Sequence, residues 1–259
     1  MKLLSVNCHA WIEKNQIEKI KILAKTIVEK QYDVIALQEV SQHKDSEIKY
    51  GNIRVDNYVE VLNEELKAMG ENSYNFVWDF SHMGYDVYEE GLAILTKHPI
   101  NSSRSFYISK DKTITNYKSR KIVEANINVN GENITFYSCH LGWWNDEDEP
   151  FKDQADELLR NMSNELSFVM GDFNNNAFVR NEGYDYLIEK GLYDTYILSE
   201  KKDDGITVPG EIDGWKSCKE EKRLDLILSN REISVKISSV MFNNKNFIIS
   251  DHYGVEVEV

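Results

Sequence analysis

The N-terminal segment begins with a short apolar run, continues with a segment of helical periodicity and returns to a second apolar run. Residues 2–7 (KLLSVN) are typical of a buried strand. The segment 15–31 places apolar residues at helical spacing, and residues 33–38 (DVIALQ) predict the next strand. This order predicts the start of an α/β domain. Asn7 and Glu39 would each lie at the carboxyl end of a strand, where α/β folds place their chemistry.

The rest of the chain mixes strands that follow one another directly with strands separated by helices. Residues 120–129 and 133–139 are joined across Asn130 and Gly131, which predicts an antiparallel hairpin. Because hairpins and helical crossovers occur together, we expect two mixed sheets packed together with helices outside. Helices are expected at 57–69, 151–162 and 182–190, a polar loop at 199–222, and further strands at 74–79, 91–96, 166–171, 224–229, 233–241 and 253–258.

Composition supports one globular domain and argues against a nucleic-acid partner. The 259 residues include 41% apolar residues, which is enough for a substantial core. The sequence shows no internal repeat and no linker-like tract, so we expect a single domain over residues 1–259. The formal net charge of −14 disfavours approach to a polyphosphate backbone unless positive charge is concentrated locally.

Cysteine usage and the hydropathy of the N-terminus indicate a cytoplasmic location. Cys8, Cys139 and Cys218 show no C-x-x-C spacing, so we expect reduced thiols rather than disulfides or a zinc site. The apolar start before Asn7 is too short for a signal-peptide core, and no stretch approaches the roughly 20 apolar residues of a membrane span. We therefore expect no membrane association.

Polar side chains follow or interrupt most of the apolar strands. Each has an ordinary explanation, because Asp and Asn commonly turn the chain at a strand end. As a set they supply oxygen ligands for Mg²⁺ or Mn²⁺, together with imidazoles and carboxylates for proton transfer. Metal-assisted cleavage of a phosphate ester requires this combination. The set comprises Asn7, Glu39, His140, Asp172, Asn174, Asp225, Asp251 and His252.

A series of short motifs resembles the endonuclease/exonuclease/phosphatase superfamily. GDFN and SDH are weak alone, but their order together with QE and RLD is specific. The motifs extend from residue 6 to residue 255, which is essentially the whole chain. They are VN at 6–7, LQEV at 37–40, GLAILTKHPI at 91–100, YKSR at 117–120, SCHLG at 138–142, GDFN at 171–174, RLDLILS at 223–229 and SDHYGV at 250–255.

The resemblance implies a fold and a metal site. The fold is a four-layer α/β sandwich, in which two mixed β-sheets pack face to face and helices cover both outer sides. By the matching motifs, Glu39 would be the principal ligand of Mg²⁺ or Mn²⁺. Asn7 and Asp251 would complete or support the metal site.

The resemblance also implies roles in the reaction. Asp172 and Asn174 would orient the attacking water, and His140 would donate to the phosphate in the transition state. Asp225 would hold and polarise His252. Asp172 and His252 are both candidates for the group that takes the proton from water, and we assign this role to them jointly.

Three further residues are candidates for substrate binding. Arg120 lies where the family often places an arginine that contacts phosphate, although a surface charge on a strand explains it almost as well. Trp143 and Trp144 precede the acidic run 145–150 (NDEDEP), and aromatic faces beside hydrogen-bond acceptors suit a sugar. The alternative is one Trp packed in the core and a solvated acidic run. Without a basic groove, we expect a small phosphorylated substrate rather than nucleic acid.

The amino-acid sequence of residues 1–11 and 140–151 resembles that of a small-phosphatase branch of the superfamily, the bacterial maltose 6′-phosphate phosphatases. This resemblance implies release of phosphate from a sugar phosphate. Two alternatives are a phosphodiesterase of the same superfamily, either a nuclease or a sphingomyelinase-like enzyme, and a non-enzymatic binding module. A binding module is expected to lack a metal or histidine position, and none is missing. Four other histidines lie outside the catalytic positions: His9, His43, His82 and His98. Of these, His9 is close to Asn7 in the sequence.

Overall fold

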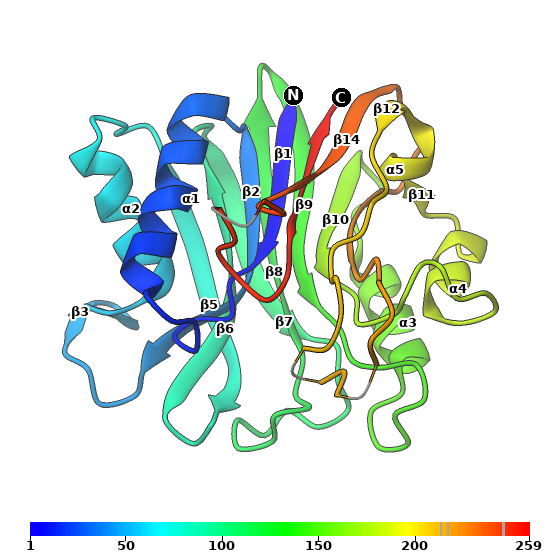
Figure 1. Ribbon diagram of the computed structural model, residues 1–259, viewed down its shortest axis with the longest axis horizontal. Helices are drawn as coiled ribbons and strands as arrows, with labels where there is room; N and C mark the ends of the chain where they lie inside the picture. The colour runs from blue at the N-terminus through cyan, green and yellow to red at the C-terminus, as the bar shows by residue number, and fades with distance from the viewer. Residues whose placement is uncertain (213, 217, 245–246) are drawn as a thin grey trace.

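Two mixed β-sheets lie face to face in the computed structural model, which describes residues 1–212, 214–216, 218–244 and 247–259 (Figure 1). The larger sheet has seven strands, in the order β12 (Ser199–Lys202), β14 (Val235–Met241), β15 (Gly254–Glu258), β1 (Lys2–Asn7), β2 (Val34–His43), β6 (Tyr88–Thr96) and β5 (Asn75–Gly84). The smaller sheet has six, in the order β11 (Tyr193–Asp194), β13 (Asp225–Ser229), β10 (Ser167–Asp172), β9 (Glu132–His140), β8 (Lys121–Val129) and β7 (Ile100–Tyr107). A separate ribbon pairs β3 (Ile48–Tyr50) with β4 (Ile53–Arg54).

Helices cover both outer faces of the sheets. Helices α1 (Gln16–Lys30) and α2 (Tyr58–Ala68) lie on one side, and α3 (Phe151–Asn161) and α4 (Gly183–Glu189) lie on the other (Figure 1). The short helix α5 (Thr195–Leu198) packs beside β14. In the described residues, no helix has the length and apolar character needed to cross a membrane. The arrangement is a four-layer α/β sandwich, which confirms the expected fold class.

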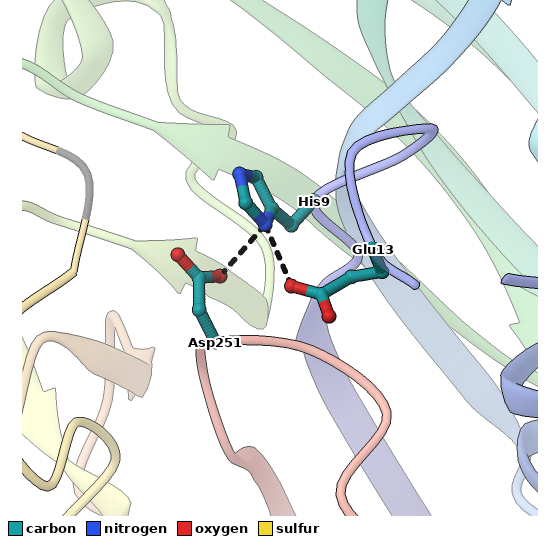
Figure 2. A group of neighbouring side chains, drawn as sticks. All are labelled: His9, Glu13 and Asp251. Carbon is teal, nitrogen blue, oxygen red and sulfur yellow. Dashed lines mark hydrogen bonds and ion pairs between the residues drawn. The ribbon is translucent and has the colours of Figure 1, made fainter. Parts of the chain in front are cut away.

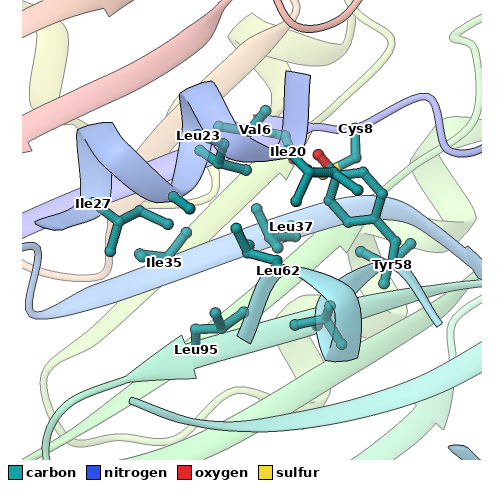
Figure 3. Close-up of a cluster of buried hydrophobic side chains, with 14 of the residues drawn as sticks. Val6, Cys8, Ile20, Leu23, Ile27, Ile35, Leu37, Tyr58, Leu62 and Leu95 are labelled. Atoms are coloured by element: carbon teal, nitrogen blue, oxygen red, sulfur yellow. The ribbon is translucent and has the colours of Figure 1, made fainter. Parts of the chain in front are cut away.

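Three hydrophobic clusters fill the spaces between the layers. The first joins α1 and α2 to the larger sheet, and α1 contributes Ile20, Leu23 and Ile27 from one face (Figure 3). This spacing is the apolar stripe expected of an amphipathic helix. The second cluster lies between the two sheets and includes the stacked rings of Phe136 and Phe168, with centroids 5.5 Å apart. The third joins the smaller sheet to α3 and α4.

Most elements agree with the sequence pattern, with some exceptions. Val129 pairs with Glu132 across Asn130 and Gly131, which both have positive φ, so the expected hairpin between β8 and β9 is confirmed. The strand expected at 33–38 forms only part of the longer β2. Strand β7 was not expected, because most of its residues are polar and exposed and carry no buried alternation.

Two pairs of parallel strands bring their carboxyl ends to one edge of the sandwich. Strand β1 is parallel to β2 in the larger sheet, and β9 is parallel to β10 in the smaller. Strand β13 is antiparallel to β10, which sets Asp225 opposite Asp172. Nearby, Gln38 Nε2 donates to Ser138 Oγ at 3.1 Å and links the two sheets. This edge therefore receives side chains from both sheets.

Candidate active site

Side chains from both sheets converge on a cavity of about 380 Å³ at this edge. Asn7 Nδ2 donates to Glu39 Oε1 (2.9 Å) and to Asp172 Oδ2 (3.2 Å), and so joins β1, β2 and β10. The Nε2 atoms of His140 and His252 each lie 3.7 Å from the same Asp172 oxygen. Among the residues predicted for the site, those that line the cavity are Glu39, Arg120, His140, Trp143, Asp172, Asn174, Asp251 and His252.

Irregularities in β2 and β5 direct side chains into this cavity. The register between β2 and β6 shifts around Glu39, which has a φ of 51°. The register between β5 and β6 shifts next to His82. Both shifts lie beside Gly91 of β6, where an added Cβ would meet Asp79 O at 2.1 Å. Since β-bulges commonly re-aim side chains next to active sites, the paired bulges explain why Glu39 and His82 both face the cavity.

Asp225 and His252 form a buried pair of a carboxylate and an imidazole. His252 Nδ1 donates to Asp225 Oδ2 at 2.9 Å. Burial lowers the pKa of His252, but the carboxylates of Asp225 and Asp172 raise it, and the net direction is well above the usual range. Burial raises the pKa of Asp172 to about 7 in spite of the charge on His252, and Asp225 adds to the rise. Asp172 and His252 can therefore share a proton.

His140 differs from His252 in its protonation. Arg120 Nη1 lies 3.2 Å from His140 Nδ1, and a guanidinium can only donate, so Nδ1 accepts and the neutral ring carries its proton on Nε2. Burial and the charge of Arg120 hold the pKa of His140 well below its usual range. His140 therefore presents a neutral N–H donor to the cavity.

The side chain of Asn174 is occupied by protein partners. Its Nδ2 donates to Leu141 O (2.9 Å), and its Oδ1 accepts from Trp215 Nε1 (3.0 Å). Its main-chain N–H donates to Asp172 Oδ1 (2.8 Å) and so helps to hold Asp172. The predicted polar loop 199–222 begins with strand β12, and Trp215 belongs to the loop that follows this strand. The described part of that loop reaches the site, which the sequence did not indicate.

A buried lysine holds that loop in place. Lys222 Nζ donates to the main-chain oxygens of Gly210 (2.8 Å), Cys218 (3.0 Å) and Glu220 (2.8 Å). The same ammonium group lies 5.6 Å from the ring centroid of Trp215. Because these contacts surround Trp215, Lys222 supports the hydrogen bond from Trp215 to Asn174.

His9 lies between two acidic residues at the cavity wall. Its Nδ1 hydrogen-bonds Glu13 Oε1 (2.7 Å) and lies 3.5 Å from Asp251 Oδ1 (Figure 2). Burial lowers the pKa of His9, but the hydrogen bond to Glu13 and the charge of Asp251 raise it, to about 9. His9 is therefore positively charged at neutral pH and offsets part of the charge on Asp251.

The two adjacent tryptophans lie in different surroundings. Trp143 lines the cavity, and the Arg120 guanidinium lies 5.8 Å from its ring centroid. Trp144 packs against Phe151 and Tyr186, with ring centroids 6.1 Å away in both cases. Trp144 is not among the described residues that line the cavity. The structure therefore brings only Trp143 to the site.

The acidic run 145–150 supports the loops around it. Asp146 pairs with Lys118 at 2.9 Å, and Glu149 accepts two main-chain N–H groups of the loop 109–119, at 2.9 and 2.7 Å. No residue of the run is among the described residues that line the cavity. Asp146 and Glu149 are therefore engaged in loop structure, whereas the sequence left open whether the run accepts hydrogen bonds from a sugar or is solvated.

Several residues that the sequence analysis did not select as site residues also line the cavity, among them the titratable pair His82 and Glu90. His82 is buried, with Nδ1 3.0 Å from Ser119 O and Nε2 3.4 Å from Glu90 Oε1. Burial and the charge of Arg120 lower the pKa of His82 to about 3, and burial raises the pKa of Glu90. The only available sequence signal was the place of Glu90 directly before the motif at 91–100.

The carboxylates at the site leave an excess of negative charge that suits a divalent cation. Burial raises the pKa of Glu39 to about 7, and the charges of Glu90 and Asp251 add to the rise. Oxygen atoms of this kind are the ligands that Mg²⁺ or Mn²⁺ prefers, so the donor set fits such an ion. Asn7 Oδ1 accepts from the His9 main-chain N–H (3.2 Å), and its Nδ2 faces Glu39. In this orientation Asn7 holds the carboxylate of Glu39.

A four-layer sandwich with acidic and histidine side chains gathered at one edge is the architecture of a class of phosphoesterases. The profile of the Endonuclease/Exonuclease/phosphatase family matches residues 14–252, and the chain belongs to this family. Members of the family are hydrolases that act on phosphate esters and generally use divalent metal ions. The chain is therefore a phosphoesterase of this family.

Solved structures agree with this assignment. An endonuclease/exonuclease/phosphatase family protein from Leptotrichia buccalis is 46% identical with a TM-score of 0.93, covering 100% of this chain and 98% of that one. The fold is also shared by a mannosyl-6-phosphatase from Bacteroides thetaiotaomicron, 17% identical with a TM-score of 0.72, covering 100% and 98%. D. rerio TDP2, solved with a single-strand DNA product, is 15% identical with a TM-score of 0.70, covering 99% and 97%. A search of curated proteins gives no significant match.

Proposed function

We propose that the chain is a divalent-metal-dependent phosphomonoesterase that releases phosphate from a small polyhydroxylated substrate, a sugar phosphate such as maltose 6′-phosphate. The observation that carries the proposal is the distribution of charge in the cavity. Arg120 is the only Lys or Arg among the described residues that line it. Its Nε is buried without a hydrogen-bond partner, so one donor remains available for an anion. The cavity therefore offers one arginine for one phosphoryl group.

The metal would be held by Glu39, with support from Asn7 and Asp251. When bound, Mg²⁺ or Mn²⁺ supplies positive charge that polarises a phosphoryl oxygen. The raised pKa of Glu39 supports this role, since a carboxylate destabilised by burial and like charge gains most from a cation. Asn7 fixes the direction of the Glu39 carboxylate through its 2.9 Å hydrogen bond.

The attacking water would be oriented and deprotonated by Asp172 and His252 together. Asp225 holds His252 through the Nδ1 hydrogen bond, which turns Nε2 toward Asp172. Asn174 acts here as a positioning residue, because its main-chain N–H fixes Asp172 while its side chain is bonded to Trp215 and Leu141. Loss of the proton to this pair leaves a nucleophile beside the phosphoryl group.

His140 and Arg120 would stabilise the phosphoryl oxygens in the transition state. The neutral His140 keeps its Nε2 proton, and Arg120 contributes a full charge with an unused Nε donor. Donors fixed before the reaction stabilise developing charge without further reorganisation. The hydrogen bond between the two residues keeps both in place.

The choice of a monoester of a sugar rests on the cavity and on one structural relative. The cavity volume lies within the range of roughly 300–1,000 Å³ typical of small-molecule sites. The relative from B. thetaiotaomicron is a mannosyl-6-phosphatase. Trp143, which lines the cavity, would pack against the organic part of the substrate. Trp144 would support it from outside the cavity through its contacts with Phe151 and Tyr186.

A phosphodiesterase is the second candidate, because the D. rerio relative was solved with a DNA product. A DNA-binding face requires several cations for successive phosphates. The net charge of −14 favours the monoesterase, as does the presence of one arginine among the described residues that line the cavity.

Phosphate release from a substrate panel tests the proposal. The panel holds maltose 6′-phosphate, mannose 6-phosphate, glucose 6-phosphate, an inositol phosphate and a nucleotide, each with Mg²⁺ or Mn²⁺, beside plasmid nicking and sphingomyelin cleavage. We expect the highest kcat/KM for a sugar phosphate and complete loss with EDTA. Cleavage of DNA or lipid with no release from the monoesters would overturn the proposed substrate class and leave the family assignment intact.

A further inference from the structure

The wall of the cavity formed by β5 and β6 carries a histidine and a glutamate side by side. His82 and Glu90 are paired in the register of the two strands, directly after the irregularity at Gly91. Both line the same cavity as Arg120. The His82 side chain is only 4% exposed, and Glu90 is 14% exposed. Neither residue is needed for the reaction steps described above, so the structure leaves their use open.

The hydrogen bonding of His82 fixes what this pair offers. The main-chain oxygen of Ser119 can only accept, so His82 Nδ1 carries the proton and donates to it at 3.0 Å. In the neutral ring, Nε2 is then a lone-pair acceptor, and it lies 3.4 Å from Glu90 Oε1. A carboxylate is also an acceptor. Two acceptors thus face each other beside the cavity, and each needs a donor from a ligand or from water.

The fold makes room for this arrangement. Gly84, at the end of β5, has no side chain, and a Cβ there would lie 2.9 Å from Glu90 Oε2. Neighbouring Glu89 faces other partners, because successive residues of a strand alternate sides. It pairs with Arg54 at 2.9 Å, and this contact lowers its pKa against the effect of burial. Of the two glutamates in β6, Glu89 therefore has a cationic partner in Arg54, whereas Glu90 faces the cavity.

We propose that His82 and Glu90 form a binding subsite for two neighbouring hydroxyl groups of the sugar, one O–H donating to His82 Nε2 and the other to the Glu90 carboxylate. The inference rests on the proposed function and adds the residues that select the organic part of the substrate. A vicinal pair of hydroxyls is the common feature of sugar rings, and it supplies two donors at adjacent positions. A second phosphate is excluded from this wall by the charge of Glu90.

The experiment compares two monoesters in the wild type and in two variants. The probes are the sugar phosphate that the wild type hydrolyses fastest and p-nitrophenyl phosphate, whose leaving group has no hydroxyl pair. In Glu90→Gln, the new amide N–H can donate to His82 Nε2 and close the pair on itself. In His82→Asn, the amide keeps a donor toward Ser119 O and removes the Nε2 acceptor. Glu89→Gln, on the opposite side of the same strand, is the matched control.

We expect both variants to lower kcat/KM for the sugar phosphate by roughly tenfold to a hundredfold, mainly through KM, and to affect p-nitrophenyl phosphate much less. Glu89→Gln should leave the ratio of the two rates within about twofold of the wild type. Equal losses on both probes, or no loss on the sugar phosphate, would overturn the subsite. Circular dichroism and the melting temperature identify a variant that fails to fold. In that case, the rates of the other variant decide whether the subsite exists.

The failure of the subsite differs from a failure of the proposed function. If the wild type releases phosphate from p-nitrophenyl phosphate and from no sugar phosphate, the sugar-phosphatase function is wrong and the subsite falls with it. If the wild type prefers a sugar phosphate and the variants keep that preference, the function stands and only the subsite is wrong.

Discussion

Asp33 directly precedes strand β2 and Glu39 lies within it, yet the two carboxylates meet opposite surroundings. Asp33 accepts from the main-chain N–H of Lys2 and pairs with His98, both at 2.7 Å. Burial raises the pKa of Asp33, but these contacts and Lys97 lower it, and the net direction is downward. At Glu39, burial and neighbouring acids raise the pKa to about 7.

The opposite pKa shifts of Asp33 and Glu39 distinguish the two ends of β2. At the amino end of β2, the acid has a cation and a main-chain donor. At the carboxyl edge, the carboxylates of Glu39, Glu90, Asp172 and Asp251 line one cavity and outnumber the cationic groups among the described residues there, which are His9, Arg120 and His252. Perturbed pKa values of this kind cluster at functional sites, because catalysis needs groups that are poised and not fully satisfied. By the proposed function, the same residue types serve stability at one end and reactivity at the other.

The largest effect is expected from the groups that share the proton of the water. Asp172→Asn and His252→Ala should each lower kcat by roughly 10²–10⁴-fold, because each removes a partner in proton transfer. Phosphate release from the preferred monoester measures the loss, and circular dichroism checks the fold. Asp153→Asn on the exposed side of α3 is the control. Full activity in either site variant would show that the edge is not the catalytic site.

Glu39→Gln should abolish metal-dependent activity and at the same time stabilise the metal-free protein. The folded-state pKa lies above the ordinary value of 4.5, so the ionised carboxylate destabilises the folded state near neutral pH. In the wild type this cost disappears as the pH falls from above 7 toward 4.5. The gain in the variant at pH 8 should be of order 1–3 kcal/mol, measured by denaturant unfolding with EDTA present.

Metal addition should reverse the order of stability of the wild type and Glu39→Gln. Mg²⁺ or Mn²⁺ binds only the folded state and should raise the melting temperature of the wild type. Glu39→Gln should show little or no rise, because its principal oxygen ligand is gone. An equal rise in both proteins would place the ion elsewhere.

Arg120→Lys should have an intermediate effect. The ammonium keeps the charge but loses the planar set of donors, including the hydrogen bond to His140 Nδ1. We expect kcat/KM to fall roughly tenfold to a hundredfold. Arg104→Lys on the exposed strand β7 is the matched control and should retain activity. A similar loss in both variants would point to a general effect of replacing an arginine and not to a role of Arg120 in the cavity.

The smallest effect is expected at the amino end of β2. Asp33→Asn should lower the free energy of unfolding by roughly 0.5–1.5 kcal/mol and leave kcat unchanged. Because the folded pKa lies below the ordinary 3.8, the stabilisation is present above that pH and is lost as the pH falls through the folded pKa. Denaturant unfolding at pH 7 and pH 3 measures it. A loss of activity with an intact fold would remove the contrast between the two ends.

The sequence indicated the centre of the site because each polar residue stands next to an apolar strand. Asp172 follows a buried run and pairs with Asp225 across β10 and β13. The strand pattern therefore predicted that these side chains meet at one edge of the sandwich. It did not show that Glu39 lies in a bulge, since a bulge shifts register without changing the apolar pattern. The sequence also does not distinguish a strand that continues past Glu39, as β2 does, from a strand that ends there.

The parts that were missed depend on contacts between distant segments. His82 and Trp215 carry no motif, and they reach the cavity through strand register and through the loop held by Lys222. Trp143 and Trp144 are adjacent in sequence, and only the packing of Trp144 against α3 and α4 separates their roles. Local patterns do not contain this information.

Strand β15 lies between β1 and β14 in the larger sheet, and His252 sits just before it. Asn7, from the first strand of the chain, and His252 both face Asp172. During synthesis, a nascent chain that has formed β1, β2, β6 and β5 still lacks β15 beside β1, and it lacks both His140 and His252. The group of Asp172, Asp225 and His252 can therefore assemble only after residue 252 has left the ribosome, so a chain that stops before this residue has the cavity walls of β1 and β2 without this group.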